Sequence, residues 1–520
     1  MKRIIALILM LAMSVLLLAS CGLFGGPNNG PAADFVMPEG GYDGSAITIK
    51  FYHSMGAQLQ EILNTAIEDF NKIYPNITVE HESYGDYDGV RDQIKTEISV
   101  GNQPNLAYCY PDHIALYNVA GAVQTLDVLI NDPDVGFTQA QLDDFIEGYY
   151  NEGKTFGDGK MYSLPLSKST EVLYYNKSFF EGCVRIYNSE ILIDMDGNPI
   201  YETDKDGNVV TDAEGNPKTQ VNPNYHNENY NIKVPTTWDE MEETCRKIKV
   251  LEPTCIPLGY DSESNWFITM CEQYNSPYTS ATGENFLFNN QTNIDFVTKF
   301  RTWYQNKWVT TEELSGGYTS ALFTGESSSS TDSESSVPAG TRCYMCIGST
   351  GGATYQQPNQ TNGKFEFEVG ITSIPQVNPE APKVISQGPS ICIFKKDNPQ
   401  EVLATWLFAK FLTTDVNFQA SVSMNNGYAP VIKSVKDHPV YAEFLESADT
   451  ANIQAYAVKV ALEQEAAYYA SPAFNGSSVA RQQVGLLIQK CFTLPDAGLE
   501  AAMKKAFADA VAECKYQSGQ

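Results

Sequence analysis

The sequence is poor in the residues and motifs on which many enzymes depend. Only five of its 520 residues are histidines, and none of them stands in an H-E-x-x-H or comparable metal-binding spacing. The chain also contains no G-x-S-x-G turn, no Walker loop and no G-x-G-x-x-G that opens a helix after a strand. We therefore expect a protein that is not an enzyme and that has no cofactor and no metal site.

Basic residues are scarce as well. The chain has 34 lysines and arginines against 63 aspartates and glutamates, which gives a formal net charge of −29. A nucleic-acid-binding surface needs a basic footprint, so we expect no nucleic-acid partner. The acidic residues leave one enzymatic alternative open, an extracytoplasmic glycan hydrolase, because cleavage of a glycoside needs only two carboxylates in a cleft.

The sequence has one long apolar run, over residues 4–18, close to its start. At about 15 residues the run is shorter than the roughly 20 that span a membrane. It follows Lys2 and Arg3 and ends on Leu18-Ala19-Ser20-Cys21, the order that marks a secretory signal. Leu-Ala-Ser-Cys also resembles a bacterial lipobox, which implies acylation of Cys21. The alternative is an ordinary signal peptide with an incidental cysteine.

These features predict a signal peptide over residues 1–20 and a lipid-anchored flexible tether over residues 21–45. Residues 22–31 are rich in Gly, Pro and Asn and cannot pack a core. We therefore expect the mature protein on the extracytoplasmic face of the cell membrane, at the cell surface or in the periplasm. It would be anchored through a lipid on Cys21.

The cysteines other than Cys21 are scattered, and many lie in apolar stretches, as buried thiols do. Cys343 and Cys346 are the one closely spaced pair, and no second pair or nearby histidine completes a zinc site. We expect packed thiols, with a disulfide and a metal site as the alternatives at this pair. The remaining cysteines are Cys109, Cys183, Cys245, Cys255, Cys271, Cys392, Cys491 and Cys514.

Strand and helix patterns alternate from residue 46 onward. Period-two patterns over residues 46–52, 77–80 and 106–110 predict strands, and helical spacing over residues 59–73 and 90–100 predicts helices between them. This order predicts a mostly parallel sheet covered by helices, in a chain too long for one core. Ligands bind beyond the carboxyl ends of such strands, so the turns after Tyr52, Glu80 and Tyr110 are candidate binding loops.

Two segments depart from this pattern. Residues 194–221 contain three Asp-x-Asp-Gly-Asn or similar motifs, typical of tight turns, and they predict a β-hairpin insertion over residues 183–232. Calcium binding by these aspartates is the alternative, although the terminal glutamate of a full calcium loop is missing. Residues 324–340 are rich in serine and predict a surface loop.

Several segments together resemble the family 1 extracellular solute-binding proteins, the receptors of carbohydrate-type ABC importers. Within that family, His53-Ser54-Met55-Gly56 and the Asn475 to Arg481 spacing look most similar to the glycerol-3-phosphate receptors. The matching segments are residues 49–56, 70–79, 101–104, 162–165, 174–180, 235–240, 374–376, 387–389 and 427–431.

The resemblance implies an α/β, two-lobed, periplasmic-binding-protein-like (type II) fold. Its central sheets would be flanked by helices, with a ligand cleft between the lobes. We expect residues 46–160 to form the first part of lobe 1 and residues 161–385 to form lobe 2, with both insertions. Residues 386–520 would supply C-terminal helical segments shared between the lobes.

The resemblance also implies a set of ligand-binding residues. A polyol needs aromatic faces and fixed hydrogen-bonding groups, and an arginine can clamp a phosphate. A core position for Trp266, a turn-bracing role for Tyr428 and a surface ion pair for Arg481 are the structural alternatives. The expected residues are His53, Ser54, Tyr87, Asp112, Ser167, Ser169, Trp266, Ser349, Gly388, Tyr428 and Arg481.

The function that the resemblance implies is capture of a sugar, oligosaccharide or related polyol and its delivery to the ABC permease subunits. A glycerol-3-phosphate or phosphodiester receptor of the same family is the first alternative, and the glycan hydrolase is the second. We expect the protein to act as a monomer.

Overall fold

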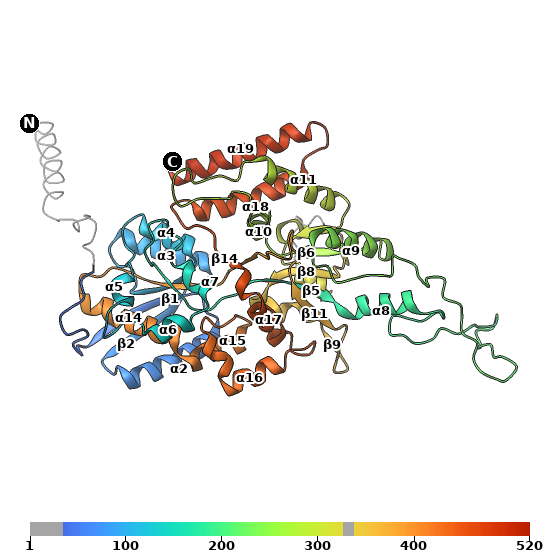
Figure 1. The fold of residues 1–520 in the computed structure, drawn as a ribbon, viewed down its shortest axis with the longest axis horizontal. Coiled ribbons are helices and arrows are strands. Elements are labelled where there is room, and N and C mark those ends of the chain that lie inside the picture. Colours follow the sequence, from blue (N-terminus) through green and yellow to red (C-terminus); the bar gives the residue numbers. More distant parts are fainter. Residues whose placement is uncertain (1–34, 326–336) are drawn as a thin grey trace, which may run out of the picture.

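The computed structural model describes residues 35–325 and 337–520, and these residues form two α/β lobes (Figure 1). The two-lobed fold expected from the sequence is confirmed. The predicted signal peptide, Cys21, most of the tether and part of the serine-rich loop lie outside the described residues.

The first lobe is built on a five-stranded sheet in the order β2-β1-β3-β13-β4. β1 pairs in parallel with β2 and β3, so the β-α-β-α-β unit predicted from the sequence is confirmed. β13 arrives from the C-terminal third and pairs antiparallel with both β3 and β4. The strands are β1 (Ile47–His53), β2 (Ile77–Ser83), β3 (Leu106–Cys109), β4 (Leu164–Pro165) and β13 (Ser390–Ile393). The helices are α2 (Ala57–Ile73), α3 (Tyr87–Ser99), α4 (Pro111–Asn118), α5 (Asp127–Ile130), α6 (Gln139–Asp144) and α7 (Glu147–Glu152).

The second lobe carries a second five-stranded sheet in the order β11-β5-β8-β6-β7. Its β8, β6 and β7 run parallel, whereas β5 and β11 are antiparallel to their neighbours. The strands are β5 (Glu171–Asn176), β6 (Leu258–Tyr260), β7 (Val309–Thr311), β8 (Met345–Ser349) and β11 (Val369–Ser373), with a short hairpin of β9 (Gln360–Thr361) and β10 (Lys364–Phe365). The helices are α8 (Lys177–Asn188), α9 (Trp238–Leu251), α10 (Glu263–Gln273), α11 (Gln291–Gln305), α12 (Glu312–Ser315), α13 (Ser320–Thr324) and η1 (Thr350–Gln356).

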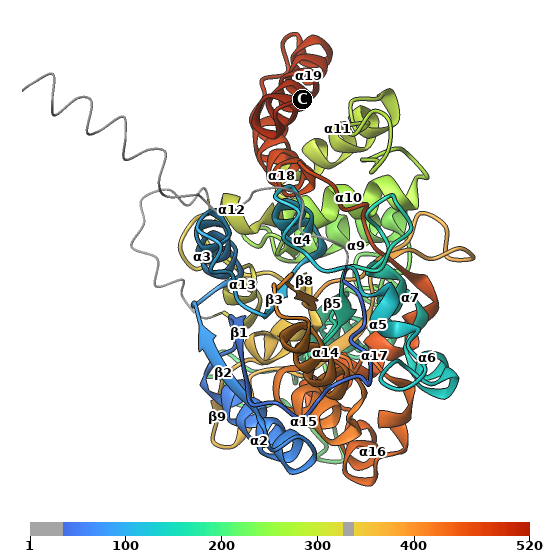
Figure 2. The same cartoon turned by 90° about the vertical axis from the view of Figure 1, so that its left-hand side faces the viewer.

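The C-terminal helices divide between the two lobes. α14 and α15 bury Trp406, Phe408 and Phe418 in the core of the first lobe, whereas α18 and α19 bury Phe492 and Phe507 in the core of the second. α18 also contacts α4 across the lobe boundary (Figure 2). The elements are α14 (Pro399–Thr414), α15 (Val416–Asn426), η2 (Lys433–Asp437), α16 (Pro439–Glu446), α17 (Ile453–Glu463), η3 (Glu465–Ala467), α18 (Ser477–Thr493) and α19 (Leu499–Ser518).

The chain crosses between the lobes from β4 to β5, from β12 (Val384–Ile385) to β13, and around α17 and β14 (Tyr468–Tyr469). Ser169 and Gln387 form a bridge between the first two crossings, and β12 pairs with β14. Gly388 has a left-handed φ of +87°, and a Cβ there would lie 2.6 Å from the carbonyl oxygen of Ser167. Only glycine therefore lets these two crossings lie so close together.

A buried ion pair holds the crossings to the first lobe. The Lys168 side chain is 0% exposed and pairs with Glu152 of α7, which is 4% exposed. Its ammonium group also donates to the carbonyl oxygen of Gly388 and to the Ser390 hydroxyl, each at 3.0 Å. One buried cation thus joins α7, the first crossing and the second.

The segment after α8 leaves the second lobe as a narrow arm (Figure 1). The arm begins at Ser189, because residues 183–188 complete α8. The aspartate that heads each of its turns accepts a hydrogen bond from the amide of the asparagine four residues later, at 2.7–2.9 Å. The bridges that join its strands are Ile191 with Val221, Ile193 with Pro199, Tyr201 with Thr219, Thr203 with Val209, and Thr211 with Pro217.

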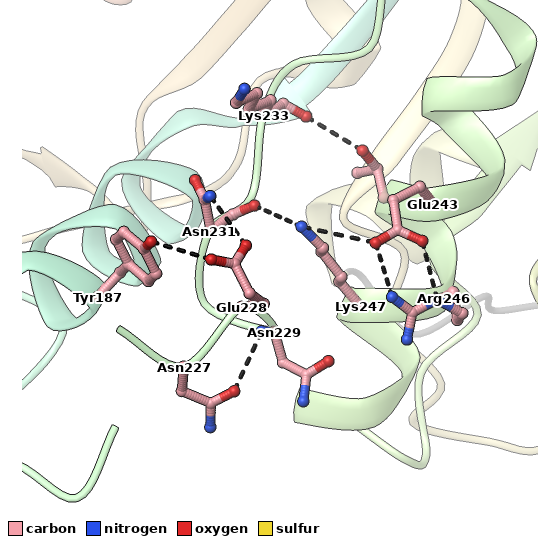
Figure 3. A network of polar contacts seen from close by, with 10 residues as sticks. Tyr187, Asn227, Glu228, Asn229, Asn231, Lys233, Glu243, Arg246 and Lys247 are labelled. Carbon is pink, nitrogen blue, oxygen red and sulfur yellow. Dashed lines mark hydrogen bonds and ion pairs between the residues drawn. The ribbon is translucent and has the colours of Figure 1, made fainter. Parts of the chain in front are cut away.

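The base of the arm is tied to α8 and α9 by the polar network of Figure 3. The Tyr187 hydroxyl donates to Glu228 at 3.0 Å, and the Lys247 ammonium donates to the carbonyl oxygen of Asn231 at 2.9 Å. Arg246 and Lys247 both pair with Glu243. The arm is therefore anchored at its base and exposed along its length.

The cysteines from Cys109 to Cys514 are all buried and unbridged in the described residues. Cys343 and Cys346 lie just before and within β8, and the thiols of Cys109 and Cys392 lie 3.6 Å apart on neighbouring strands. Among the described helices, none is long and apolar enough to cross a membrane.

Candidate functional site

A cleft of ≈ 1550 Å³ lies between the two lobes. Several of its lining residues follow the carboxyl ends of parallel strands: Tyr110 follows β3, Asp261 follows β6, and Glu312 follows β7. Both sheets therefore direct the same kind of loop into the cleft, as expected for ligand sites on such sheets.

Tyrosines form the wall that the first lobe contributes. Tyr87 begins α3, and its ring stacks on Tyr108 with centroids 5.8 Å apart and lies 4.6 Å from Tyr110. Tyr428 approaches from the loop after α15. Burial raises the pKa of Tyr87 well above its usual value, and the phenols of Tyr108, Tyr110 and Tyr428 raise it further. These rings stay neutral and offer apolar faces with hydroxyl groups at their edges.

A hydrogen-bonded chain crosses the base of the cleft. Arg481 of α18 donates to Asn265 Oδ1 at 2.5 Å, and Asn265 Nδ2 donates to Gln387 at 3.0 Å. Arg481 thus hydrogen-bonds to a neutral side chain. The buried hydroxyls of Tyr278 and Ser386 line the same cleft and have no partner among the described residues.

Carboxylates line the side of the second lobe. Burial raises the pKa of Glu171 to about 7, and its carboxylate accepts a hydrogen bond from Tyr260 at 2.7 Å. Burial also raises the pKa of Asp261 and of Glu263. Burial and the charges of Asp261, Glu263 and Glu313 raise the pKa of Glu312 to about 8. The lining is therefore acidic on this side, and Arg481 faces it.

The structure brings several of the predicted ligand residues together around the cleft. Asp112 lies in the first turn of α4, and Ser349 is the N-cap of η1, where it accepts from the amide of Gly351 at 3.1 Å. Ser169 lies in the first crossing and is buried. The predicted residues that line the cleft are Tyr87, Asp112, Ser169, Ser349, Tyr428 and Arg481.

Other predicted residues lie away from the cleft. His53 is buried at the end of β1, where its Nε2 lies 2.9 Å from His81 Nδ1 and its Nδ1 accepts from the amide of Met55. Ser54 follows it and does not line the cleft. Trp266 points into the core of the second lobe, with its ring 4.1 Å from that of Phe300.

Ser167 and Gly388 also lie behind the cleft lining, in the crossings. The Ser167 hydroxyl lies 3.4 Å from that of Tyr108. Gly388 allows the two crossing segments to pack closely because it has no Cβ. The structure thus gives both residues a part in the hinge region.

The cleft also contains residues that the sequence did not indicate. Asp261 and Glu312 directly follow β6 and β7, so a search of strand ends in the second lobe would have found them. Asn265, Gln387 and Tyr278 carry no such signal, because their place depends on the packing of α10 against α18 and the second crossing.

The arrangement is suited to binding a hydroxyl-rich solute. It offers tyrosine faces for C–H surfaces, together with buried donors and acceptors that fix hydroxyl groups. In residues 35–325 and 337–520, no cluster of three or more His, Cys, Asp or Glu side chains is arranged to hold a metal ion.

Residues 65–449 match the sequence profile of the bacterial extracellular solute-binding proteins. The sn-glycerol-3-phosphate-binding periplasmic protein UgpB of Shigella dysenteriae serotype 1 (strain Sd197) is 28% identical over 134 residues, which cover 26% of this chain and 30% of that protein. The matched region thus spans 30% of the length of this curated relative.

Solved structures are similar over much more of the chain. A cyclic alpha-maltosyl-1,6-maltose binding protein from Arthrobacter globiformis has a TM-score of 0.62 at 15% identity, and covers 90% of this chain and 99% of its own. UgpB from Mycobacterium tuberculosis, in complex with glycerophosphocholine, has a TM-score of 0.62 at 16% identity. The match covers 90% of this chain and 98% of the UgpB chain. At these identities the likeness shows the fold.

The family expected from the sequence is confirmed, since the matched profile covers more than half of the chain and the similar structures share its two-lobed fold. The chain belongs to the bacterial extracellular solute-binding proteins.

Proposed function

We propose that this protein captures a sugar, oligosaccharide or related polyol outside the cytoplasm and delivers it, chemically unchanged, to an ABC permease. The observation that carries the proposal is the cleft of ≈ 1550 Å³, which both lobes line and which combines tyrosine faces with buried polar groups. A cleft of this size exceeds the range of about 300–1,000 Å³ common for small-molecule sites, so an oligosaccharide fits it. The relatives that bind glycerol phosphate and maltose-type sugars support this solute class.

In this proposal the ligand contacts are the predicted residues that line the cleft. Tyr87 and Tyr428 stack on the solute, whereas Asp112, Ser169 and Ser349 bind its hydroxyl groups. Arg481 is the basis for the second candidate, a phosphate ester, because its guanidinium group lines the cleft and its hydrogen-bond partner among the described residues is the neutral Asn265.

A calorimetric and thermal-shift panel tests the function. Maltotriose, glycerol 3-phosphate and glycerophosphocholine are titrated into the mature protein, and mass spectrometry then measures whether each compound is recovered intact. Binding with full recovery supports a receptor, and cleavage of the sugar would instead support the glycan hydrolase.

Three variants locate the binding surface. Tyr428→Ala should raise the Kd at least tenfold, while Tyr516→Ala, an exposed tyrosine of α19 outside the cleft lining, should leave it unchanged. Arg481→Gln should weaken binding of phosphate esters at least tenfold and leave neutral sugars mostly unaffected. Equal effects of Tyr428→Ala and Tyr516→Ala would place the ligand elsewhere.

We also propose that the receptor is held at the membrane by a lipid on Cys21 and acts as a monomer. The Leu18-Ala19-Ser20-Cys21 sequence supports the anchor. Cys21→Ser should move the protein from the membrane fraction to the soluble fraction of expressing cells, and light scattering of the mature chain should give the mass of one copy. Retention of Cys21→Ser in the membrane would contradict the lipid anchor.

A further inference from the structure

We propose that the solute carries a positively charged amine or ammonium group, which binds against the carboxylates of the second lobe. The proposal rests on the proposed function and names the chemistry of its ligand. It starts from four acids that line one side of the cleft, Asp261 and Glu263 after β6 and Glu312 and Glu313 after β7.

None of these four carboxylates forms an ion pair with a lysine or arginine of the described residues. Other acids of the cleft do: Glu152 pairs with Lys168, and Asp88 pairs with Arg91. Arg481 lies at the base of the cleft and donates to Asn265. The acidic side therefore lacks a protein cation, whereas unpaired buried charge is costly.

The hydrogen bonds leave acceptor oxygens free. Asp261 Oδ1 accepts from the amide and hydroxyl of Thr319 at 2.8 and 2.6 Å. Within the described part of the chain, Oδ2 has only Gln356 Nε2 at 3.4 Å and the Cys346 thiol at 3.9 Å. Glu263 accepts from the amide of Glu313 at 3.2 Å. No described residue donates to the Glu312 carboxylate, although that side chain is half-buried.

Gln356 provides an independent observation. It is 2% exposed and lines the cleft beside Asp261, and its Nε2 binds Asp261 and Cys346. Its Oε1 is buried and accepts no hydrogen bond from the described residues. A buried amide oxygen without a donor is unfavourable, so this corner needs a ligand that donates hydrogen bonds.

An ammonium group meets both needs, since it donates hydrogen bonds and neutralises charge. Burial first, and the neighbouring acids second, raise the pKa of Glu312 to about 8, and a bound cation would favour its ionised form. Tyr318 and Tyr355 line the same side and are 65% and 75% exposed, so their rings are free to face a cation. A neutral sugar would leave the charges unpaired.

Two matched ligand pairs test the charge. The first is 1-amino-1-deoxymaltotriitol against maltotriitol, which differ by an ammonium group at neutral pH. The second is glycerophosphoethanolamine against its N-acetyl derivative, two phosphodiesters that differ in whether the amine is a charged ammonium. Calorimetry at pH 7 should give at least tenfold tighter binding for the ammonium-bearing member of one pair. Arg481→Gln distinguishes an amine on a sugar from an amine on a phosphate ester, because it should weaken binding of only the phosphate-bearing pair.

Glu312→Gln is the decisive variant. It should weaken the cationic ligand at least tenfold and change the neutral ligand less than twofold. It should also raise the melting temperature of the unliganded protein, because it removes a carboxyl group whose ionised form is disfavoured by burial and by the neighbouring acids. Glu380→Gln, at an exposed site outside the cleft, is the matched control and should change neither quantity.

The outcomes separate this inference from the function on which it rests. Members without the ammonium group that bind as tightly as those with it, with no effect of Glu312→Gln, would overturn the inference and leave the receptor function standing. A protein that binds neither member of either pair, nor maltotriose, would contradict the proposed function itself.

Discussion

At the scale of single residues, the buried cation Lys168 carries the largest energetic consequence. It binds Glu152, Gly388 and Ser390 with no exposure to solvent. Removing one member of such a pair leaves the other charged and buried, so Lys168→Met should lower the free energy of unfolding by about 3–5 kcal/mol. Urea denaturation measures the change.

The exposed Lys504–Glu500 pair of α19 provides the control for Lys168→Met. Lys504→Met should cost less than about 0.5 kcal/mol, because exposed helix pairs contribute little. A Lys168→Met protein as stable as Lys504→Met would show that the hinge pair is not desolvated.

The free energy of unfolding should depend on pH through the protonation of His53. Burial, together with the neighbouring His81, lowers its pKa from 6.5 to about 4 in the native protein. Between these values the unfolded chain binds the proton and the native protein does not, so His53 lowers stability as the pH falls from about 6.5 to about 4. The full effect is about 3 kcal/mol.

Melting temperatures of the wild type and His53→Gln between pH 7.5 and 4 measure this effect. The glutamine variant should lose less stability over the range, because it removes the titrating group. Parallel curves for the two proteins would show that His53 is not responsible.

The sequence predicted individual site residues where an aromatic or charged side chain follows a strand or begins a helix. Tyr87 begins α3 after β2, and Asp112 begins α4 after β3, so both reach the cleft. His53 ends β1, yet β1 is flanked on both sides by strands, and the ring packs against His81. Trp266 lies next to Asn265, which lines the cleft, but on α10 it points into the core. Neighbouring residues of a helix point in different directions, so a shift of one position separates a cleft residue from a core residue.

At the scale of elements, the outer part of the arm should be dispensable. Residues 202–218 lie outside both lobe cores, and Tyr201 and Thr219 are bridged at its inner end. Replacing residues 202–218 with Asn-Gly should close a two-residue hairpin and leave the melting temperature within about 2 °C of the wild type. Ligand affinity should also be unchanged, because the arm does not line the cleft.

Differential scanning calorimetry and titration of the shortened protein test this prediction. A matched deletion that also removes residues 222–232 should destabilise the protein, since buried Asn222 donates to the carbonyl oxygens of Ile186 and Ser189. If both deletions behave alike, the network at the base of the arm has no stabilising role.

Helices and strands of the first lobe were predictable because the spacing of their apolar residues matches the residues that are buried. α2 buries Leu63, Ala66, Ile67 and Phe70 on one face and ends before Pro75. The extent of α8 was less predictable, because its last turn runs into the arm without a proline or glycine to end it. The tight turns of the arm followed from Asp-Gly-Asn, but the stacking of its strands depends on pairing between them.

At the scale of the whole molecule, the crossings set how the lobes face each other. A methyl group at Gly388 would clash with the Ser167 carbonyl oxygen, and the left-handed backbone there is unfavourable for alanine. Gly388→Ala should therefore destabilise the protein by about 1–3 kcal/mol. It should also weaken ligand binding without a change in any lining residue, because it displaces one lobe relative to the other.

Gly283→Ala is the matched control, since Gly283 has a similar φ of +71° but no atom within 4 Å of its added Cβ. Binding and urea denaturation of both variants measure the difference. Equal loss of ligand affinity in the two variants would show that the spacing of the crossings does not control the cleft.

The two-lobed architecture was predictable from the resemblance. Local sequence patterns did not indicate which C-terminal segments join the sheet of the first lobe. β13 lies between β3 and β4, and nothing in residues 390–393 indicates that partner choice. The acidic side of the cleft also depends on tertiary structure, because Asp261 and Glu312 come together only when β6 and β7 pair.

The position of β13 constrains the order in which the protein can fold. The first lobe lacks the strand between β3 and β4 until residue 393 is present, and the core of the second lobe lacks Phe507 and Cys514 until the last helix is made. A chain emerging from its N-terminus therefore completes neither lobe early. Both lobes are incomplete until residue 393 has emerged, and the second lobe remains incomplete until α19 is made.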